Sequence, residues 1–219
     1  MTESYEHERP KRRNEVTERS LPPLVLPPLD PELWGIFEWS LQCRFLNPAV
    51  AVANRWYPTS EAGDTEPRIV IPGTPISRGP FWQARAMSGA ALLRYQSPHG
   101  PREDSIVIVC AVGKLEQVVI CEGPMDALAA AGEGSWGIAL MGNTPPLEVL
   151  ENVVRQIRNF GPKSVLFVED QDAAGSLVRI MPYVLSYIGK ETLCRLTVAY
   201  PGKDLAACSP AERQRLLAL

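Results

Sequence analysis

Short apolar runs alternate with helical stretches through the second half of the 219-residue chain, and this rhythm limits the fold more than any other feature. Four runs are predicted as strands: residues 118–121, 136–142, 164–168 and 193–200. Helices are predicted between and after them: residues 124–132, 145–160, about 173–188 with a kink at Pro182, and a short helix from about residue 210. Strands that alternate with helices indicate an α/β fold with a mostly parallel sheet covered by helices.

Acidic residues follow three of these predicted strands. Glu122 follows the first strand, Asp170 and Asp172 follow the third, and Asp204 follows the fourth. Because the carboxyl ends of parallel strands share one edge of a sheet, we expect the four carboxylates to gather there. Neighbouring carboxylates repel one another unless a cation lies between them, and oxygen ligands without His or Cys favour Mg²⁺ or Mn²⁺ over zinc. Any one of these acids could instead be a solvated loop end or a helix cap, Asp172 above all.

The formal net charge of −3 hides an uneven distribution of charge along the chain. Residues 68–102 contain five arginines and no Asp or Glu, whereas residues 103–219 contain 10 basic and 14 acidic residues. The planar fork of arginine pairs well with phosphate. We therefore expect Arg85 and Arg94 to contact phosphates. The aromatic residues of this segment, such as Tyr95, could stack on a base but are more typical of core packing.

The composition excludes several other classes of protein. The five cysteines are odd in number and form no CxxC pair, and there are two histidines, so neither a disulfide framework nor a zinc site is indicated. The apolar runs are too short to span a bilayer, and the N-terminus is charged. We expect a cytoplasmic protein with no membrane partner. Residues 1–31 are predicted to form a flexible charged tail followed by a Pro-rich strap.

Three motifs in the second half resemble the TOPRIM domain that bacterial-type primases, topoisomerases and some nucleases share. They are CEGPMDAL at 121–128, FVEDQDAAG at 167–175 and PGKD at 201–204. The resemblance implies that the catalytic residues, which hold Mg²⁺ or Mn²⁺, are Glu122, Asp170, Asp172 and Asp204. Primases usually carry a second acid two residues after the last motif, where this chain has Ala206. Asp126 is expected to cap or orient the helix after Glu122.

Upstream motifs are similar to the amino-terminal subdomain of the bacterial primase catalytic core. They are RIVIP at 68–72, FWQAR at 81–85 and RYQSP at 94–98. The resemblance implies a template and nucleotide groove lined by Arg68, Arg85, Arg94 and Tyr95, and Lys203 is expected to add a charge beside the triphosphate. The chain then divides into a tail (1–31), a smaller basic mixed α/β subdomain (32–115), a TOPRIM domain (116–208) and a C-terminal helix (209–219).

The resemblance implies a DNA-directed primase that makes short primers from nucleoside triphosphates on single-stranded DNA by metal-dependent nucleotidyl transfer. The first 35 residues hold no zinc-ligand set, and the sequence ends soon after the last motif. We therefore expect a catalytic core without zinc-binding or helicase-binding modules, as in a phage, plasmid or other mobile element. A helicase or other replication protein would supply template choice or unwinding.

Two other functions stay open at this point. A TOPRIM nuclease would use the same acids, but the motifs at residues 68–98 are those of primases. A non-catalytic replication subunit or regulator would keep the fold without the chemistry, and Ala206 favours this alternative.

Overall fold

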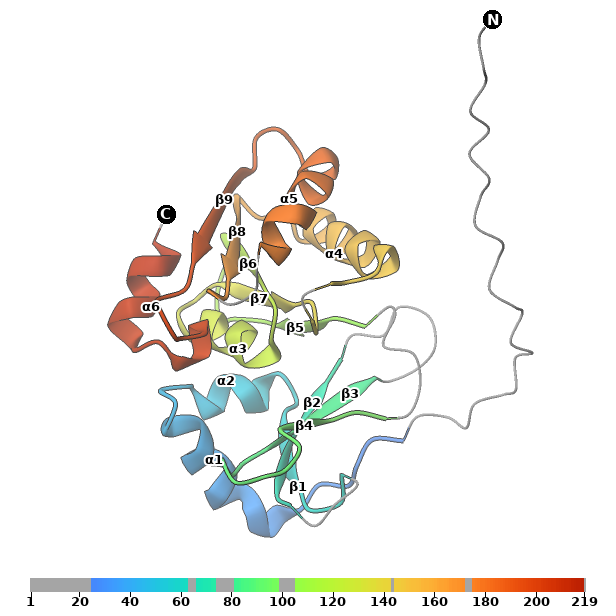
Figure 1. Ribbon diagram of the computed structural model, residues 1–219, viewed down its shortest axis with the longest axis vertical. Helices are drawn as coiled ribbons and strands as arrows, with labels where there is room; N and C mark the ends of the chain where they lie inside the picture. The colour runs from blue at the N-terminus through green and yellow to red at the C-terminus, as the bar shows by residue number, and fades with distance from the viewer. Residues whose placement is uncertain are drawn as a thin grey trace, which may run out of the picture.

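The computed structural model describes residues 25–62, 66–73, 81–98, 105–142, 144–171 and 175–218, and within them the strands form two sheets (Figure 1). The first sheet has the order β1-β2-β3-β4, and all its neighbours are antiparallel. Its strands are β1 (Tyr57–Thr59), β2 (Arg68–Pro72), β3 (Trp82–Ala86) and β4 (Tyr95–Gln96). The 3-10 helix η1 (Pro31–Leu33) and the helices α1 (Trp34–Gln42) and α2 (Pro48–Ala53) precede it.

The second sheet contains the four strands predicted from the apolar runs. Its order is β5-β7-β6-β8-β9, with β6 parallel to β7 and β8, and β8 parallel to β9. The strands are β5 (Val107–Val109), β6 (Gln117–Cys121), β7 (Trp136–Ala139), β8 (Ser164–Glu169) and β9 (Leu193–Val198). The mostly parallel sheet is thus confirmed. β5 pairs antiparallel with β7, so a strand from the segment before residue 116 belongs to this sheet.

Helices cover both faces of the second sheet, as predicted. One hydrophobic cluster packs α4 (Leu147–Phe160) and α5 (Ser176–Tyr187) onto one face. Another packs α3 (Pro124–Gly132) onto the opposite face. The chain ends in the 3-10 helix η2 (Leu205–Ala207) and α6 (Pro210–Leu217). Pro182 lies inside α5, which continues through it.

The close approach of α3 to β7 depends on a glycine. A Cβ atom added to Gly137 would lie 2.4 Å from the Cα and from the carbonyl oxygen of Ala127, closer than real Cβ atoms come. The side chains of α3 are small and buried, which allows this packing. The helix therefore lies directly against the sheet and begins just beyond Glu122.

The two sheets share a core. The cluster that includes Val119 and Leu128 of the second sheet and its helix also contains Phe37, Leu41 and Trp56 from the N-terminal part. Buried apolar area of this kind is the main stabilising contribution in such folds. The two halves are consequently packed as one body along the α3 face.

The described part of the Pro-rich strap lies on the first sheet. The carbonyl oxygens of Pro27 and Val25 accept hydrogen bonds from the Tyr57 hydroxyl at 2.7 Å and from the Trp82 indole Nε1 at 3.1 Å. Residues 25–30 have no regular secondary structure, as predicted for a strap, whereas the charged tail and the first residues of the strap, at 1–24, lie outside the described residues. Of the helices in the described ranges, none has both the length and the apolar character needed to cross a membrane.

Candidate active site

Two of the predicted acids lie at the same edge of the second sheet. Glu122 follows β6 and Asp170 follows β8, and these strands are parallel neighbours. Both side chains are half-buried. The pKa of the Cys121 thiol is raised well above its usual value, first by burial and then by the negative charges of Asp126, Asp170 and Glu122. Negative charge therefore gathers around the end of β6.

The third described acid, Asp204, caps η2. Its side chain accepts a hydrogen bond from the Ala207 backbone N–H at 2.7 Å. It is half-buried, and its Oδ2 lies 3.9 Å from Nη2 of Arg94. The fourth predicted acid, Asp172, lies outside the described residues.

Asp126 connects α3 to η2. Its buried carboxylate accepts a hydrogen bond from the Ala206 backbone N–H at 2.8 Å. Burial, together with the negative charges of Asp204 and Asp170, raises the pKa of Asp126 to about 8. The sequence suggested a role in capping or orienting the helix that follows Glu122. In the structure Asp126 lies in the first turn of α3 but bonds a distant element, and the N-cap residue of that helix, Gly123, provides no side-chain cap.

An arginine cluster lies beside these acids, formed by Arg85 and Arg94 at the ring of Tyr95, with Arg44 near enough to interact with their charges. Arg85 is 3% exposed, and its Nη1 donates to the Tyr95 hydroxyl at 2.5 Å. The guanidinium carbons of Arg85 and Arg94 lie 5.1 and 6.0 Å from the centre of the Tyr95 ring. Arg85, Arg94 and Tyr95 were predicted from the sequence, whereas Arg44 was not.

Arg44 interacts electrostatically with the other members of the cluster. The pKa of Arg44 is lowered first by burial and then by the positive charges of Arg85 and Arg94, while Asp204 acts in the opposite direction. The side chain of Arg94 is 61% exposed, so its guanidinium is accessible to an incoming anion. The arginine cluster, which comes from the first sheet and the turn after α1, thus lies close to Asp204, which follows the last strand of the second sheet.

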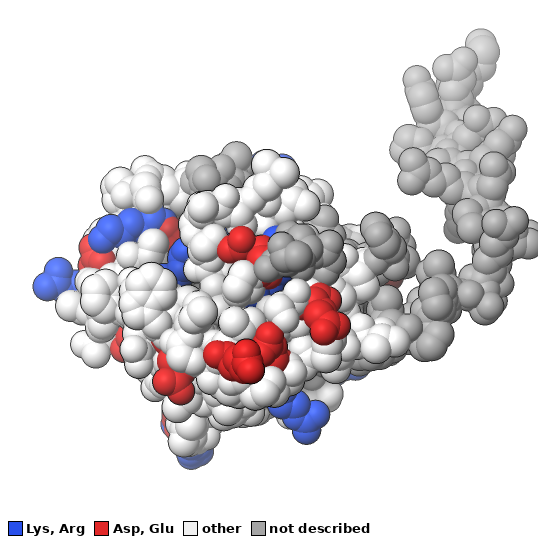
Figure 2. All heavy atoms as spheres, turned by 90° about the horizontal axis from the view of Figure 1, so that it is seen from below, with Lys and Arg blue, Asp and Glu red and all other residues white. Residues whose placement is uncertain are grey.

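The face that carries α1 differs from this region. Seen from below, it consists mostly of uncharged surface with separate acidic groups, and the visible Lys and Arg atoms lie mainly toward the margins (Figure 2). Large apolar side chains of α1 are exposed, including Ile36 and Trp39. In the described part of the chain, the arrangement suited to phosphate is therefore the arginine cluster rather than this lower face.

Arg68 and Lys203, which were predicted to serve the template and the triphosphate, are both bonded to other groups of the protein. Arg68 is completely buried, and its guanidinium donates to the carbonyl oxygens of Ala84 at 3.3 Å and Leu93 at 3.0 Å. This placement argues against the expected phosphate contact, because the donors serve the protein backbone. The Lys203 ammonium lies 2.8 and 2.9 Å from the two carboxylate oxygens of Glu212, so the first turn of α6 already holds the charge that we expected near the triphosphate.

Two residues that position this region gave no signal in the sequence. Arg213 of α6 is 1% exposed and donates to four carbonyl oxygens, those of Arg44, Phe45, Leu205 and Ala206. It thereby joins the turn after α1 to η2.

Asn54 makes a second connection between the halves of the molecule. Its side chain donates to the Cys110 carbonyl at 3.0 Å and accepts from the Cys110 backbone N–H at 2.8 Å. A lone Arg in a terminal helix and an Asn after α2 have many uses, so only their partners reveal these roles.

The donor set at this edge matches a hard divalent cation. Among the described residues no group of three or more His, Cys, Asp and Glu side chains lies close enough to hold a metal ion, and Asp172 is not among them. The available donors of Glu122, Asp170 and Asp204 are all carboxylate oxygens, which suit Mg²⁺ or Mn²⁺ better than zinc. After burial, the negative charges of Asp204 and Asp170 contribute to the raised pKa of Asp126, and a cation at this edge would offset those charges.

No protein-family model matches this sequence, and no curated protein matches it. Solved structures do match. The primase fragment of the bacteriophage T7 primase-helicase protein superposes with a TM-score of 0.53 at 13% identity, over 80% of this chain and 70% of that chain. The RNA polymerase domain of Mycobacterium tuberculosis primase DnaG, solved with double-stranded DNA, gives 0.52 at 18% identity, over 86% and 71%.

The Aquifex aeolicus primase, comprising zinc-binding and RNA polymerase domains, gives a TM-score of 0.51 at 15% identity, over 77% of this chain and 51% of that chain. These likenesses have low sequence identity and extend over 77–86% of this chain. They bear on the fold, and the α/β architecture expected from the sequence agrees with them. The chain has a primase-like fold.

Proposed function

We propose that this chain is a primase-like nucleotidyltransferase that makes short primers on single-stranded DNA. The observation that carries the proposal is the meeting of two opposite groups: carboxylates at one edge of the second sheet and the arginine cluster of the N-terminal half. Phosphoryl transfer depends mostly on positioning and on offsetting the charge of the phosphates. The primase-like fold supports this choice among the possible phosphoryl-transfer reactions.

The acids and the arginines have separate roles in this proposal. Glu122, Asp170, Asp172 and Asp204 would hold Mg²⁺ or Mn²⁺, which when bound offsets negative charge on the triphosphate. Arg94 would contact phosphates of the nucleotide or template through its exposed guanidinium. The Tyr95 ring lies under Arg94 and fixes Arg85 beside it.

The partners that we propose are a single-stranded template, nucleoside triphosphates and a helicase or other replication protein. One of the similar solved structures is a fragment of a primase-helicase protein, and another was solved with DNA. Both support a role in DNA replication.

The proposal is tested by primer synthesis. Purified protein with labelled nucleotides, single-stranded templates and Mg²⁺ or Mn²⁺ should yield short oligonucleotides, and a chelator should abolish them. Asp170→Ala should lose the activity. Glu191→Ala removes an exposed carboxylate from the loop before β9 and should retain it. If the wild type makes no oligonucleotides on a broad panel of templates, the proposal of stand-alone catalysis is wrong.

A non-catalytic replication subunit is the second candidate, and Ala206 favours it. This alanine stands where primases usually carry a second acid, its side chain is 1% exposed, and its N–H is bonded to Asp126. Calorimetric titration with Mn²⁺ separates the two functions. Metal binding that Asp170→Ala removes supports catalysis, whereas a folded protein that binds no Mn²⁺ supports the adaptor. Nicking of plasmid DNA in the same buffers would instead indicate a TOPRIM nuclease.

A further inference from the structure

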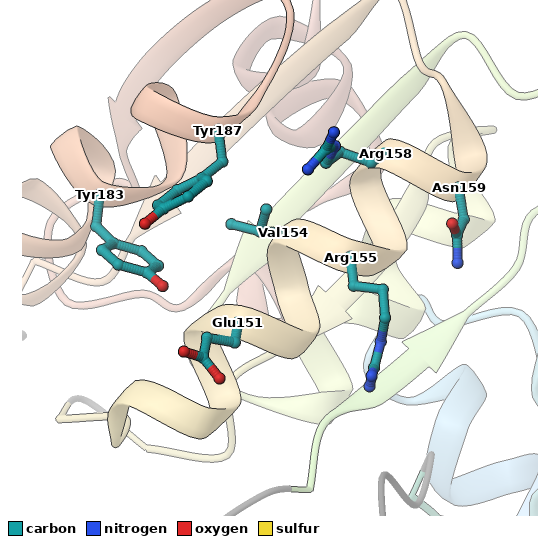
Figure 3. A pocket seen from close by; sticks show the side chains of 7 residues that line it. All are labelled: Glu151, Val154, Arg155, Arg158, Asn159, Tyr183 and Tyr187. Carbon is teal, nitrogen blue, oxygen red and sulfur yellow. The ribbon is translucent and has the colours of Figure 1, made fainter.

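A pocket of about 550 Å³ lies between α4 and α5, on the sheet face opposite α3 (Figure 3). Its volume is in the usual range for small-molecule sites. The lining residues are Glu151, Val154, Arg155, Arg158, Asn159, Tyr183 and Tyr187.

The pocket is separate from the candidate active site. α4 and α5 begin near the carboxyl ends of the strands, whereas Arg158 and Tyr187 lie in their last turns. The 14 residues of α4 span about 20 Å at the usual rise of about 1.5 Å per residue. A phosphate on Arg158 and a base against Tyr187 therefore lie toward the opposite end of these helices from the acids that follow β6 and β8, whereas Glu151 lies in the second turn of α4.

Two tyrosines give the pocket an aromatic wall. Tyr183 and Tyr187 lie one turn apart on α5, with ring centres 5.0 Å apart and planes tilted by 51°. Val154 is the one aliphatic side chain in the lining, and the other members are polar or charged. An apolar peptide anchor would find little aliphatic surface here. A planar heterocycle with polar edges suits the wall better, because aromatic rings stack on any base.

The opposite wall supplies a cation. No described residue forms a hydrogen bond or an ion pair with Arg158, an exposed side chain in the last turn of α4. Val154 and Arg158 point from α4 toward the tyrosines, whereas Arg155 points away from them (Figure 3). Arg155 is also engaged, since its Nη2 donates to Asn152 at 2.9 Å. One guanidinium is therefore available to an anion beside the aromatic wall.

One further polar group lies near the tyrosines. Glu151 offers carboxylate acceptors to the edge of a base, whereas Asn159 lies beyond Arg158 on the side of α4 away from the tyrosines (Figure 3). The pKa of the Tyr183 hydroxyl is raised by desolvation, by Tyr187 and by Glu151, so this hydroxyl remains a neutral hydrogen-bonding group.

We propose that this pocket binds a nucleotide, with the base against Tyr183 and Tyr187 and a phosphate on Arg158. The nucleotide is either a free nucleoside triphosphate or one unit of a single strand, because both present a base joined to a phosphate. This site goes beyond the proposed function, since it uses none of the metal-binding acids and needs no metal. It is a second nucleotide contact on the outer face of the molecule.

The test measures binding by the full chain in the presence of a chelator. Fluorescence anisotropy with a labelled nucleoside triphosphate and with a labelled single-stranded oligonucleotide distinguishes the two sources. Arg158→Ala and Tyr187→Ala should each weaken binding of at least one probe by about tenfold or more. If the variants bind the triphosphate more weakly, the ligand of the pocket is a free nucleotide. If they bind only the oligonucleotide more weakly, the ligand is a unit of a single strand.

Matched controls are available on other faces. Arg215→Ala removes an arginine from the last turn of α6, and Trp39→Ala removes an exposed aromatic ring from α1. Both should bind the probes as the wild type does. Asp170→Ala should also retain binding in chelator, which separates this site from failure of the proposed catalysis.

Photocrosslinking provides a second measurement on the unmodified protein. An oligonucleotide or nucleotide that carries 5-iodouracil should crosslink to the peptide containing Tyr183 or Tyr187. If the pocket variants bind both probes as tightly as Arg215→Ala, or if crosslinks map only to other segments, the assignment is overturned.

Discussion

Removal of the Arg213 guanidinium should destabilise the protein strongly, because this side chain joins its two halves. Arg213 is 1% exposed and donates at 3.1 Å to Leu205, at 2.8 Å to Ala206, at 2.7 Å to Phe45 and at 2.8 Å to Arg44. Each hydrogen bond from a charged donor contributes about 1.5–3 kcal/mol. The sum over four bonds overstates the effect, because water can reach the partly buried carbonyls of Arg44 and Phe45 after truncation.

The two fully buried bonds, to Leu205 and Ala206, set the magnitude. Their loss predicts a decrease of about 3–5 kcal/mol in the free energy of unfolding for Arg213→Ala. This is less than the full strength of the two bonds, because the wild type also bears the cost of burying the guanidinium charge. That burial lowers the pKa of Arg213. For a chain of this length the corresponding fall in Tm is about 6–20 °C.

Urea denaturation followed by tryptophan fluorescence measures this change. Arg215→Ala removes an exposed arginine from the same helix and should stay within about 0.5 kcal/mol of the wild type. Arg213→Lys should fall between the two, because one ammonium cannot reach all four carbonyls. A loss below about 1 kcal/mol for Arg213→Ala, or one equal to that of Arg215→Ala, would refute the view that this side chain connects α6, η2 and the turn after α1.

Three further predictions follow from buried groups. The pKa of Asp126, raised to about 8 from 3.8, means that the folded protein holds a proton that the unfolded chain releases, so the free energy of unfolding should decrease as pH rises between these values. Asp126→Asn should flatten that slope in urea titrations, and identical slopes for variant and wild type would contradict it. Gly137→Ala should lower the free energy of unfolding by about 1–3 kcal/mol, because the new methyl group meets the backbone of α3. Gly35→Ala, with open space around it in α1, should raise the free energy of unfolding by up to about 1 kcal/mol. The opposite order of the two variants in thermal melts would count against the packing of α3 on β7. Tyr95→Phe should lower the free energy of unfolding by about 0.5–1.5 kcal/mol, because it removes the hydroxyl that accepts the hydrogen bond from Arg85. Tyr95→Leu should lower it more, because the ring under the guanidinium is also lost. Equal decreases for the two variants would exclude a role for the ring.

Local sequence patterns predicted the second sheet well. β-branched runs such as that of β6, bounded by glycine and proline, mark buried parallel strands whatever the rest of the chain does. The three-residue strand β5 was not assigned, and its antiparallel pairing with β7 depends on a partner about 30 residues away. A run of this length carries no information about which edge of a sheet it will join.

The arginines show the same limit at the candidate site. Arg68 and Arg94 belong to the same acid-free segment, yet Arg68 is completely buried and the side chain of Arg94 is 61% exposed. β2 pairs with a strand on each side, whereas Arg94 precedes β4 at the edge of the sheet. Residue type alone therefore identified candidate phosphate ligands without telling a structural arginine from an accessible one.

The sequence by itself determined the alternation of strands and helices, and with it the edge at which Glu122 and Asp170 meet. This follows from chain direction alone, because parallel strands must end on the same side of their sheet. Only the tertiary structure decided which distant groups surround that edge. Arg44, Asn54 and Arg213 each act on groups that are distant in the sequence, and contacts of that kind depend on how the two sheets pack rather than on any local pattern.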